Sequence, residues 1–382
     1  MDRYRAALLD WMACAAGGAG ERAARAARTA GDGLLEQVTW LGTAGHVLDF
    51  DDTYLPGIAH LSAPTAPAAI ALGAARGAST AGVLRAYAAG FEAMGALTRA
   101  SRPALYDGGW HPTAVCGSAG AAVVAARLLG LSGQATTGAV RLALLRAGGT
   151  RAGFGSDGKA LAVGMAAAAG VHAALAAAGG ARVDGEDGPG DDPAAGRFGF
   201  AEVFGGAWAE PDPADPAIAR NWVKPWPCCL MAHGAIEAAL SLDGADGPVE
   251  AVVHPVARAA AGYDDVADGL EAKFSIPYLV ALARLRGEPR PESFAAVDPE
   301  VREAARQVSV RTDPSLGESE AVLLAGGDEA ARVTASRGSP ERPLDAAQLA
   351  DKVRRLAGER LDGVLDDPAR PARDLLDALA QL

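Results

Sequence analysis

Apolar side chains recur at helical spacing through the first 180 residues of the chain. Near the start, Leu8, Leu9, Met12 and Ala16 fall on one side of a helix, because three or four residues separate them. The abundant alanines strengthen this preference, since alanine has the highest intrinsic helix propensity. The pattern predicts helices at residues 4–16, 21–29, 33–53, 65–77, 79–101, 113–129, 133–147 and 159–178.

The pattern changes from helical spacing to alternation near residue 249. Val249, Ala251, Val253 and Pro255 alternate with other residues, which is typical of a strand. Further strands are expected at 307–311, 320–324 and 331–335, and further helices at 276–286 and 298–306. Residues 223–340 are therefore expected to form a smaller α/β domain.

Helical spacing returns at the end of the chain, in residues 345–358 and 367–381. We expect the whole segment 341–382 to pack back onto the first domain, residues 1–222. The sequence thus predicts a mainly α protein, in which a large, discontinuous all-helical domain is interrupted by an inserted α/β domain. A length of 382 residues fits two domains.

The charge balance restricts the partners of the protein. A formal net charge of -12 argues against nucleic acid or an anionic membrane as the main partner. A few buried cations can still bind an anionic metabolite. The four cysteines include one adjacent pair and no C-x-x-C pair, so they indicate neither a disulfide framework nor a zinc site and fit a reducing cytoplasm.

No segment is expected to enter a membrane. Asp10 interrupts the apolar run near the start, so this run is interpreted as an amphipathic helix rather than a signal peptide. The stretch 160–178 comes nearest to a membrane span, but its Ala, Gly and His content favours tight packing in a soluble core.

An acidic cluster follows a histidine at the end of the third predicted helix, in the run His46-Val47-Leu48-Asp49-Phe50-Asp51-Asp52-Thr53. On a helix through residue 53, one face carries His46, Asp49, Phe50 and Thr53, whereas Asp51 and Asp52 point elsewhere. One interpretation is a solvated helix C-terminus. Another is a Mg²⁺ site, which would require a second acidic motif on a facing helix and an aromatic-lined pocket; the sequence shows neither.

Two further motifs place candidate acid–base and anion-binding groups at helix starts. His111 comes just before a predicted helix, whose field lowers the pKa of the imidazole and keeps it neutral, as a general base requires. Lys159 follows the turn GSDG and opens a long helix, where it can bind an anion together with free backbone N–H groups. The alternatives are a structural histidine and a lysine that faces solvent.

The second half of the chain adds a lysine and a tyrosine. Prolines on either side of Trp226 hold an extended segment at the expected domain boundary, so Lys224 projects from a stiff hinge. Cys228 and Cys229 are expected to be buried packing residues rather than nucleophiles. Tyr278 lies where a helix begins in the smaller domain, and its phenol serves either packing or acid catalysis.

In this order and spacing, the motifs resemble those of the MmgE/PrpD family, which includes 2-methylcitrate dehydratase, cis-aconitate decarboxylase and iminodisuccinate epimerase. The runs that carry the resemblance are AGHVLDFDDT with His60 downstream, GGWHPTA, GSDGKALAVGMAAAAGV, KPWPCCLMAH and AKFSIPY. The resemblance extends over nearly the whole chain from about Tyr4. It implies a large helical domain interrupted by a smaller α/β domain, a homodimer, and a site between the two domains.

Carried over residue by residue, the resemblance implies a set of site residues with assigned roles. His111 would act as acid or base, with Tyr278 as the complementary acid and Asp49 orienting a neighbouring side chain. Lys159 and Lys224 would hold substrate carboxylates. Two further site residues are Thr53, which would hydrogen-bond the substrate, and His60, which belongs to the catalytic group.

The sequence departs from the family pattern near His60. His60-Leu61-Ser62 stands where the family usually has His-Pro-Ser, and the loop from Thr53 is one residue longer, so the position of His60 stays open. A basic His-Pro-Lys-Gly segment also has no clear match. Fewer basic groups would suit a substrate with fewer carboxylates than methylcitrate. The departures therefore indicate a divergent member of the family, in a specialised biosynthetic pathway.

The expected function is that of a cytoplasmic lyase that needs no cofactor or metal. It would dehydrate or decarboxylate a small di- or tricarboxylate by proton transfer, and it would bind neither nucleic acid nor membrane. The alternatives are an epimerase or isomerase on the same scaffold, a non-catalytic family member, and a Mg²⁺-dependent terpenoid-type enzyme built on the acidic cluster.

Overall fold

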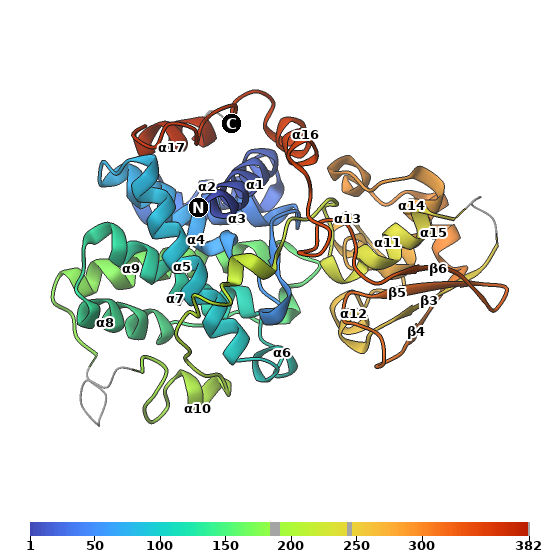
Figure 1. The fold of residues 1–382 in the computed structure, drawn as a ribbon, viewed down its shortest axis with the longest axis horizontal. Helices are drawn as coiled ribbons and strands as arrows, with labels where there is room; N and C mark the ends of the chain where they lie inside the picture. Colours follow the sequence, from blue (N-terminus) through green and yellow to red (C-terminus); the bar gives the residue numbers. More distant parts are fainter. Residues whose placement is uncertain (184–191, 243–246, 381–382) are drawn as a thin grey trace.

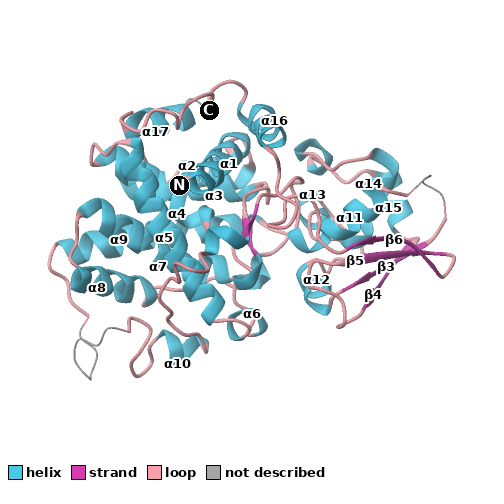
Figure 2. Cartoon of the chain, viewed as in Figure 1, coloured by secondary structure: helices cyan, strands magenta, loops and turns pink. Residues whose placement is uncertain are grey.

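The chain folds into a large helical part and a smaller α/β part that lie side by side (Figure 1). The structure is a computed structural model that describes residues 1–183, 192–242 and 247–380. Among these residues helices dominate, and strands form one small sheet in the α/β part and one short pair near the junction (Figure 2). The predicted mainly α fold with a smaller α/β part is confirmed.

The helical part takes up the first half of the chain. Its helices are α1 (Asp2–Gly18), α2 (Arg22–Arg28), α3 (Leu34–Val47), α4 (Ser62–Ala75), α5 (Thr80–Ala100), α6 (Ala104–Asp107), α7 (Pro112–Leu129), α8 (Gly133–Leu144), α9 (Asp157–Ala178) and α10 (Phe200–Phe204). Short 3-10 turns lie at Leu55–Gly57, Arg151–Gly153 and Ala217–Arg220. All eight helices predicted for this half are present, while the two shortest helices, α6 and α10, were not predicted.

Small residues bring α3, α7 and α9 into close contact. A Cβ atom added at Gly164 of α9 would lie 2.2 Å from the carbonyl oxygen of Thr39 in α3, and one at Gly170 would lie 2.2 Å from that of Ser118 in α7. Only glycine permits such an approach of two backbones. This packing fixes the helix ends that carry the candidate site.

The α/β part is built on a four-stranded mixed sheet in the order β4-β3-β5-β6. β3 (Val249–Val253) runs parallel to β4 (Val308–Thr312) and antiparallel to β5 (Ala321–Ala325), which pairs with β6 (Asp328–Val333). The helices of this part are α11 (His233–Leu240), α12 (Pro255–Ala260), α13 (Gly269–Ala272), α14 (Ile276–Arg286) and α15 (Pro299–Ala305). Two 3-10 turns lie at Leu230–Ala232 and Pro291–Phe294. All four predicted strands are present, but Pro255, which continued the first strand pattern, begins α12 instead.

The C-terminal helices lie on the helical part (Figure 1). α16 (Ala346–Ala357) contacts α1 through a buried ion pair, in which Nζ of Lys352 is 2.6 Å from Oδ1 of Asp10. α17 (Ala372–Ala380) packs on α4, and the Ala372 N–H donates to the carbonyl oxygen of Ala78 at 2.8 Å. The last residue of the predicted helix 367–381 lies outside the described residues.

Two helices, α7 and α9, are long and apolar enough to cross a membrane by length and composition. α7 is mostly buried inside the structure, and α9 is half buried. Core helices of soluble proteins have the same properties. Cytoplasmic location stays a prediction.

Candidate active site

All four lysines of the chain are buried, although basic residues are otherwise arginines on the surface or near it. Three of the lysines donate to consecutive carbonyl groups at the end of α3. Lys273 binds the carbonyl oxygen of Leu48 at 2.8 Å, Lys224 that of Asp49 at 2.9 Å, and Lys352 that of Phe50 at 2.7 Å. These carbonyls belong to the C-cap of α3 and the two residues after it, where the chain leaves the helix, and each is bound by an ammonium group.

This arrangement ends α3 six residues before the predicted helix end. α3 stops at Val47, and Asp49 has a φ of 53°, in the left-handed region that aspartate tolerates better than most residues. Thr53 then enters the short strand β1 (Thr53–Tyr54), which pairs with β2 (Asn221–Trp222). The predicted helical face of His46, Asp49 and Thr53 is therefore wrong, and the acidic run follows a loop.

Asp49 is held between two lysines. Its Oδ1 lies 2.7 Å from Nζ of Lys159, in the first turn of α9, and its Oδ2 lies 3.3 Å from Nζ of Lys224. Burial alone would raise the pKa of the Asp49 carboxyl, but the two ammonium groups hold it well below its usual range. In this structure, Lys159 thus binds an internal carboxylate, and the role of Asp49 as an orienting group stays a prediction.

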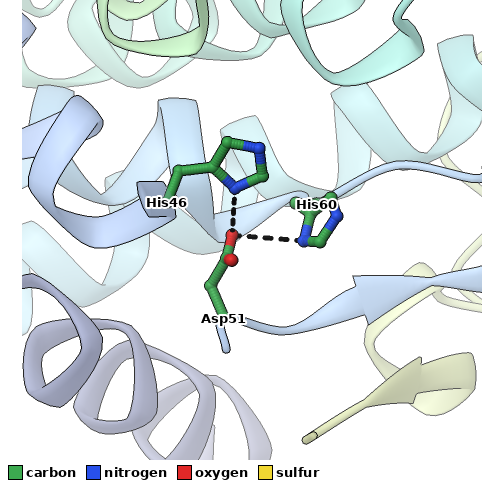
Figure 3. A group of neighbouring side chains, drawn as sticks. All are labelled: His46, Asp51 and His60. Atoms are coloured by element: carbon green, nitrogen blue, oxygen red, sulfur yellow. Dashed lines mark hydrogen bonds and ion pairs between the residues drawn. The ribbon is translucent and has the colours of Figure 1, made fainter. Parts of the chain in front are cut away.

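Asp51 joins two histidines (Figure 3). Its Oδ2 lies 2.8 Å from Nδ1 of His46 and 3.2 Å from Nδ1 of His60. All three side chains are buried, so the expectation that Asp51 points away from His46 is wrong. Burial alone would raise the pKa of Asp51, but the two imidazoles hold it well below its usual range. The pKa of His60 is lowered to about 4, mainly by burial.

His46 lies between the Asp49–lysine contacts and the Asp51–histidine contacts. Its Nε2 lies 2.9 Å from Nζ of Lys159, while its Nδ1 faces Asp51. The ring also packs edge-on against His60 and stacks on His111, with centroid distances of 4.5 Å and 5.9 Å. Two histidines and one lysine predicted as site residues are therefore gathered around a histidine that the prediction did not include.

His111 is the N-cap of α7, with Pro112 in the first helical position. Its ring is buried, packs edge-on against Phe154 at 5.0 Å, and has a pKa well below the usual value. Burial is the largest cause, followed by the positive charge of Lys159, so the neutral imidazole predicted for this position agrees with its surroundings. Phe154 also stacks on Phe274, from the α/β part, at 5.6 Å.

Asp52 has a different role from its neighbours. It accepts hydrogen bonds from the N–H and hydroxyl of Ser62, at the start of α4, and from the Asn221 side chain. Burial, followed by repulsion from Asp51, raises the pKa of Asp52 to about 7. Because all three carboxylates are buried and bonded, the interpretation of the run as a solvated helix C-terminus is wrong.

Within the described residues, His46, Asp51 and His60 form the one group whose ligand atoms are close enough to hold a metal ion. Tetrahedral Zn²⁺ with bonds of 2.0–2.1 Å would separate neighbouring ligand atoms by about 3.3 Å. His46 and Asp51 are closer than that, and the positive charge of Lys159 next to His46 opposes a cation. The geometry fits a hydrogen-bonded group better than a coordination sphere.

The remaining predicted residues lie at or beyond the edge of this cluster. The three acceptors around the Lys224 ammonium are the carboxylate and carbonyl of Asp49 and the carbonyl of Cys228. The hydroxyl of Thr53 is buried without a hydrogen-bond partner in the described part of the chain. Tyr278 is packed in the core of the α/β part, and its hydroxyl accepts from the Asp298 N–H at 3.0 Å, so the structure does not bring this phenol to the cluster.

A cavity of about 450 Å³ lies next to the cluster, between α16 and residues 288–292 of the α/β part. It is lined by Phe50 and Pro225, the chain neighbours of Asp49 and Lys224. None of the cluster's imidazoles, nor Lys159, lines it. Among the described residues, Lys159 and His60 keep small exposed fractions of their own, 8% and 11% of the side chain.

Comparison with known families identifies the family of the chain. The model of the MmgE/PrpD N-terminal domain matches residues 38–210, and that of the MmgE/PrpD C-terminal domain matches residues 226–373. The chain belongs to the MmgE/PrpD family. The predicted resemblance is thereby confirmed.

The chain is also similar to a human enzyme, the cis-aconitate decarboxylase of Homo sapiens. The two are 35% identical over 141 residues, which is 36% of this chain and 29% of the human protein. The chain thus matches less than a third of the length of this relative. Family and relative together support an enzyme of the lyase type.

Proposed function

We propose that this MmgE/PrpD protein is a cofactor-independent lyase that acts by proton transfer on a small di- or tricarboxylate. The observation that carries the proposal is the Lys159 ammonium, buried beside the neutral imidazole of His46, with His60 and His111 packed on the same ring. Such a site offers a cation for a carboxylate and uncharged bases in one place.

The cluster has an excess of positive charge. Lys159, Lys224 and Lys273 outnumber the two ionised carboxylates of Asp49 and Asp51 while the imidazoles are neutral. Two N–H groups of Lys159 face Asp49 and His46, which leaves the third for a substrate carboxylate. A charge-assisted contact of this kind contributes about 1.5–3 kcal/mol.

Both lyase reactions can proceed with these groups alone. In dehydration, a neutral imidazole removes a proton next to a carboxylate, and the electron pair forms a double bond as the β-hydroxyl takes up a proton and leaves as water. In decarboxylation, the bond to a carboxylate breaks, CO₂ leaves, and the electron pair that remains on carbon takes the N–H proton of an imidazole, which a water molecule then replaces. Lys159 stabilises the charge that spreads onto the neighbouring carboxylate in either case.

We assign the proton transfers to His60 and His111. Tyr278, predicted as the complementary acid, bonds the Asp298 backbone instead, so a second imidazole takes over its role. Lys224 supports the site by holding Asp49 rather than by contacting substrate, since protein acceptors already surround its ammonium group.

An NMR assay in D₂O tests this function. The protein would be incubated with citrate, methylcitrate, cis-aconitate, malate, tartrate and iminodisuccinate-type acids, each with and without a chelator. We expect loss of water or CO₂ from one of them, deuterium in its product, and no effect of the chelator. A folded Lys159→Met variant should lose this activity. If no acid changes while the wild-type protein is folded, the assignment to small carboxylates is wrong.

An epimerase is the second candidate, and the pairing of two neutral imidazoles favours it. Two bases on one scaffold can remove a proton from one face of a carbon and return it to the other. The same assay distinguishes the reactions, because an epimerase would exchange the proton for deuterium and invert the centre without loss of water or CO₂.

A further inference from the structure

His46 is constrained at both of its ring nitrogens. Nδ1 faces a carboxylate oxygen of Asp51 at 2.8 Å, and Nε2 faces the Lys159 ammonium at 2.9 Å. Burial lowers the pKa of His46, so the ring is neutral and carries one proton. A carboxylate can only accept and an ammonium can only donate. Only the tautomer with its proton on Nδ1 makes both contacts favourable.

His60 is constrained by the same carboxylate oxygen. Its Nδ1 is 3.2 Å from Asp51, and its Nε2 is 3.7 Å from Oδ1 of Asp49, which already accepts from Lys159. The nearer acceptor favours the Nδ1–H tautomer here as well. The contact is longer and less well aligned than that of His46, so Asp51 holds the His60 tautomer less tightly.

We infer that Asp51 is a positioning residue, whose single carboxylate oxygen fixes the Nδ1–H tautomers of His46 and His60. His46 can then accept from Lys159, and His60 presents an unprotonated Nε2 on the side of Asp49 and Lys159. An imidazole whose far nitrogen is bound by a carboxylate is oriented for use as a base. The catalytic part of this inference rests on the proposed function, whereas the tautomers do not.

Two other histidines serve as references for the tautomer with the proton on Nε2. Nδ1 of His254 accepts from the Val256 N–H at 3.2 Å, and Nε2 of His233 faces the carbonyl oxygen of Cys228 at 3.3 Å. Both contacts require the proton on Nε2 when the rings are neutral. One spectrum should therefore show His46 and His60 in one tautomer, and His233 and His254 in the other.

A multiple-bond ¹H–¹⁵N correlation spectrum of ¹⁵N-histidine-labelled protein tests the tautomers directly. Single His→Gln variants assign the signals. We expect Nδ1–H for His46 and His60, and Nε2–H for His233 and His254. If His46 or His60 is protonated on Nε2 in the wild-type protein, the inference is overturned. Metal ligation through Nδ1 would produce that opposite pattern.

A matched pair of variants tests the role of Asp51. In Asp51→Asn the acceptor loses its charge and an amide donor faces the imidazoles, so we expect the His60 signal to shift to Nε2–H. Asp52→Asn changes the neighbouring buried carboxylate, which binds no histidine, and should keep both Nδ1–H signals. Unchanged tautomers in Asp51→Asn, or their loss in Asp52→Asn as well, would overturn the inference.

Once a substrate is found, kinetics separate positioning from structure. Asp51→Asn should lower kcat by about tenfold or more with little change in KM, as expected when a base is present in the wrong tautomer. Asp52→Asn should keep kcat within about threefold. A shifted tautomer with unchanged kcat would show that Asp51 does not position the base. If no substrate is found, the proposed function fails, but the tautomer test stands.

Discussion

At the scale of single residues, the buried histidines, aspartates and lysines of the site shift one another's pKa values. In the described part of the chain, no carboxylate orients His111 in the way Asp51 orients His60. His111 lies at a helix N-terminus beside Lys159 and keeps a neutral ring. A neutral imidazole in such a place can donate a hydrogen bond to a substrate oxygen or exchange a proton with carbon. The two histidines are therefore expected to have different roles in catalysis.

Replacing His111 tests its part in the reaction. We expect His111→Ala to reduce turnover at least tenfold with the fold intact, because a positioned acid or base contributes typically 10²–10⁴-fold. Arg373→Ala serves as a control, since that side chain is exposed on α17. Turnover and far-UV circular dichroism would be measured for both variants. A loss smaller than tenfold removes His111 from the mechanism.

The buried histidines also predict how stability depends on pH. Burial lowers the pKa of His60 to about 4 and that of His233 to about 3, and it lowers those of His46 and His111. The unfolded chain therefore binds more protons than the folded one between about pH 4 and 6.5, so stability falls as the pH falls through this range. Asp52 acts in the opposite direction, because its pKa is raised to about 7 and its contribution is lost as the pH rises.

Thermal unfolding at pH 7 and pH 5 measures this balance. We expect the wild-type protein to have the lower Tm at pH 5. The decrease should be smaller in His233→Gln, which removes a buried imidazole outside the catalytic group, and larger in Asp52→Asn, which removes the opposing carboxyl. Equal decreases in all three proteins would contradict the assigned ionisation states.

At the scale of elements, the end of α3 is the feature on which the site depends. The ammonium groups that bind its carbonyls come from residues 175, 225 and 302 positions away in the sequence. All three belong to segments beyond the helical first half, so the turn at residues 47–50 links the helical part to the hinge, to the α/β part and to α16. Loss of any of these contacts leaves a buried carbonyl without its donor.

Lys273→Met tests this role of the lysines in stability. The variant keeps much of the side-chain volume but leaves the carbonyl of Leu48 unpaired, so we expect a loss of about 1–3 kcal/mol in the free energy of unfolding. Arg354→Met, on the exposed side of α16, removes a surface cation as a control and should change little. Denaturant titration measures both. An unchanged Lys273→Met protein would show that the carbonyls find other partners.

Elements that depend on local sequence patterns could be predicted, whereas the end of α3, where distant residues make contact, could not. Helices such as α5 and α7 follow from dense apolar spacing, and β3 to β6 follow from alternation within a few residues. No glycine or proline follows Val47 to mark the end of α3, and the lysines that bind the carbonyls after it lie far along the chain. Asp51 reaches His46 and His60 because the chain turns at residues 47–50. The prediction of a continuous helix therefore placed Asp51 on the side away from His46.

The family motifs brought together residues that periodicity could not. They identified Asp49, His60, His111, Lys159 and Lys224, which the structure gathers in one cluster around His46. Lys273 lies in a quoted motif but was not predicted as a site residue. The scarcity of lysine in a chain rich in arginine was the available signal, because all four lysines are buried.

At the scale of the whole molecule, the exposed side of α9 is a candidate interface for the predicted homodimer. This helix is strongly apolar, yet only half of it is buried. Its outer side carries Met165, which is 63% exposed, with partly exposed Leu161 and Leu175 on either side along the helix. A long apolar stripe open to water is unfavourable in a monomer and is typical of a surface that another chain covers.

We therefore propose that a second copy of the chain covers α9, and that Met165→Asp disrupts the pair. A buried, unpaired carboxylate at the centre of an apolar interface is costly, so the variant should sediment as a monomer where the wild-type protein sediments as a dimer. Val203→Asp, at a 55% exposed apolar position on α10, is the matched control and should remain dimeric. A wild-type monomer would remove the dimer altogether, whereas a dimeric Met165→Asp variant would place the interface elsewhere. Because Lys159 opens the same helix whose outer side carries Met165, a monomeric variant with lower turnover would further indicate that dimerisation supports the active site.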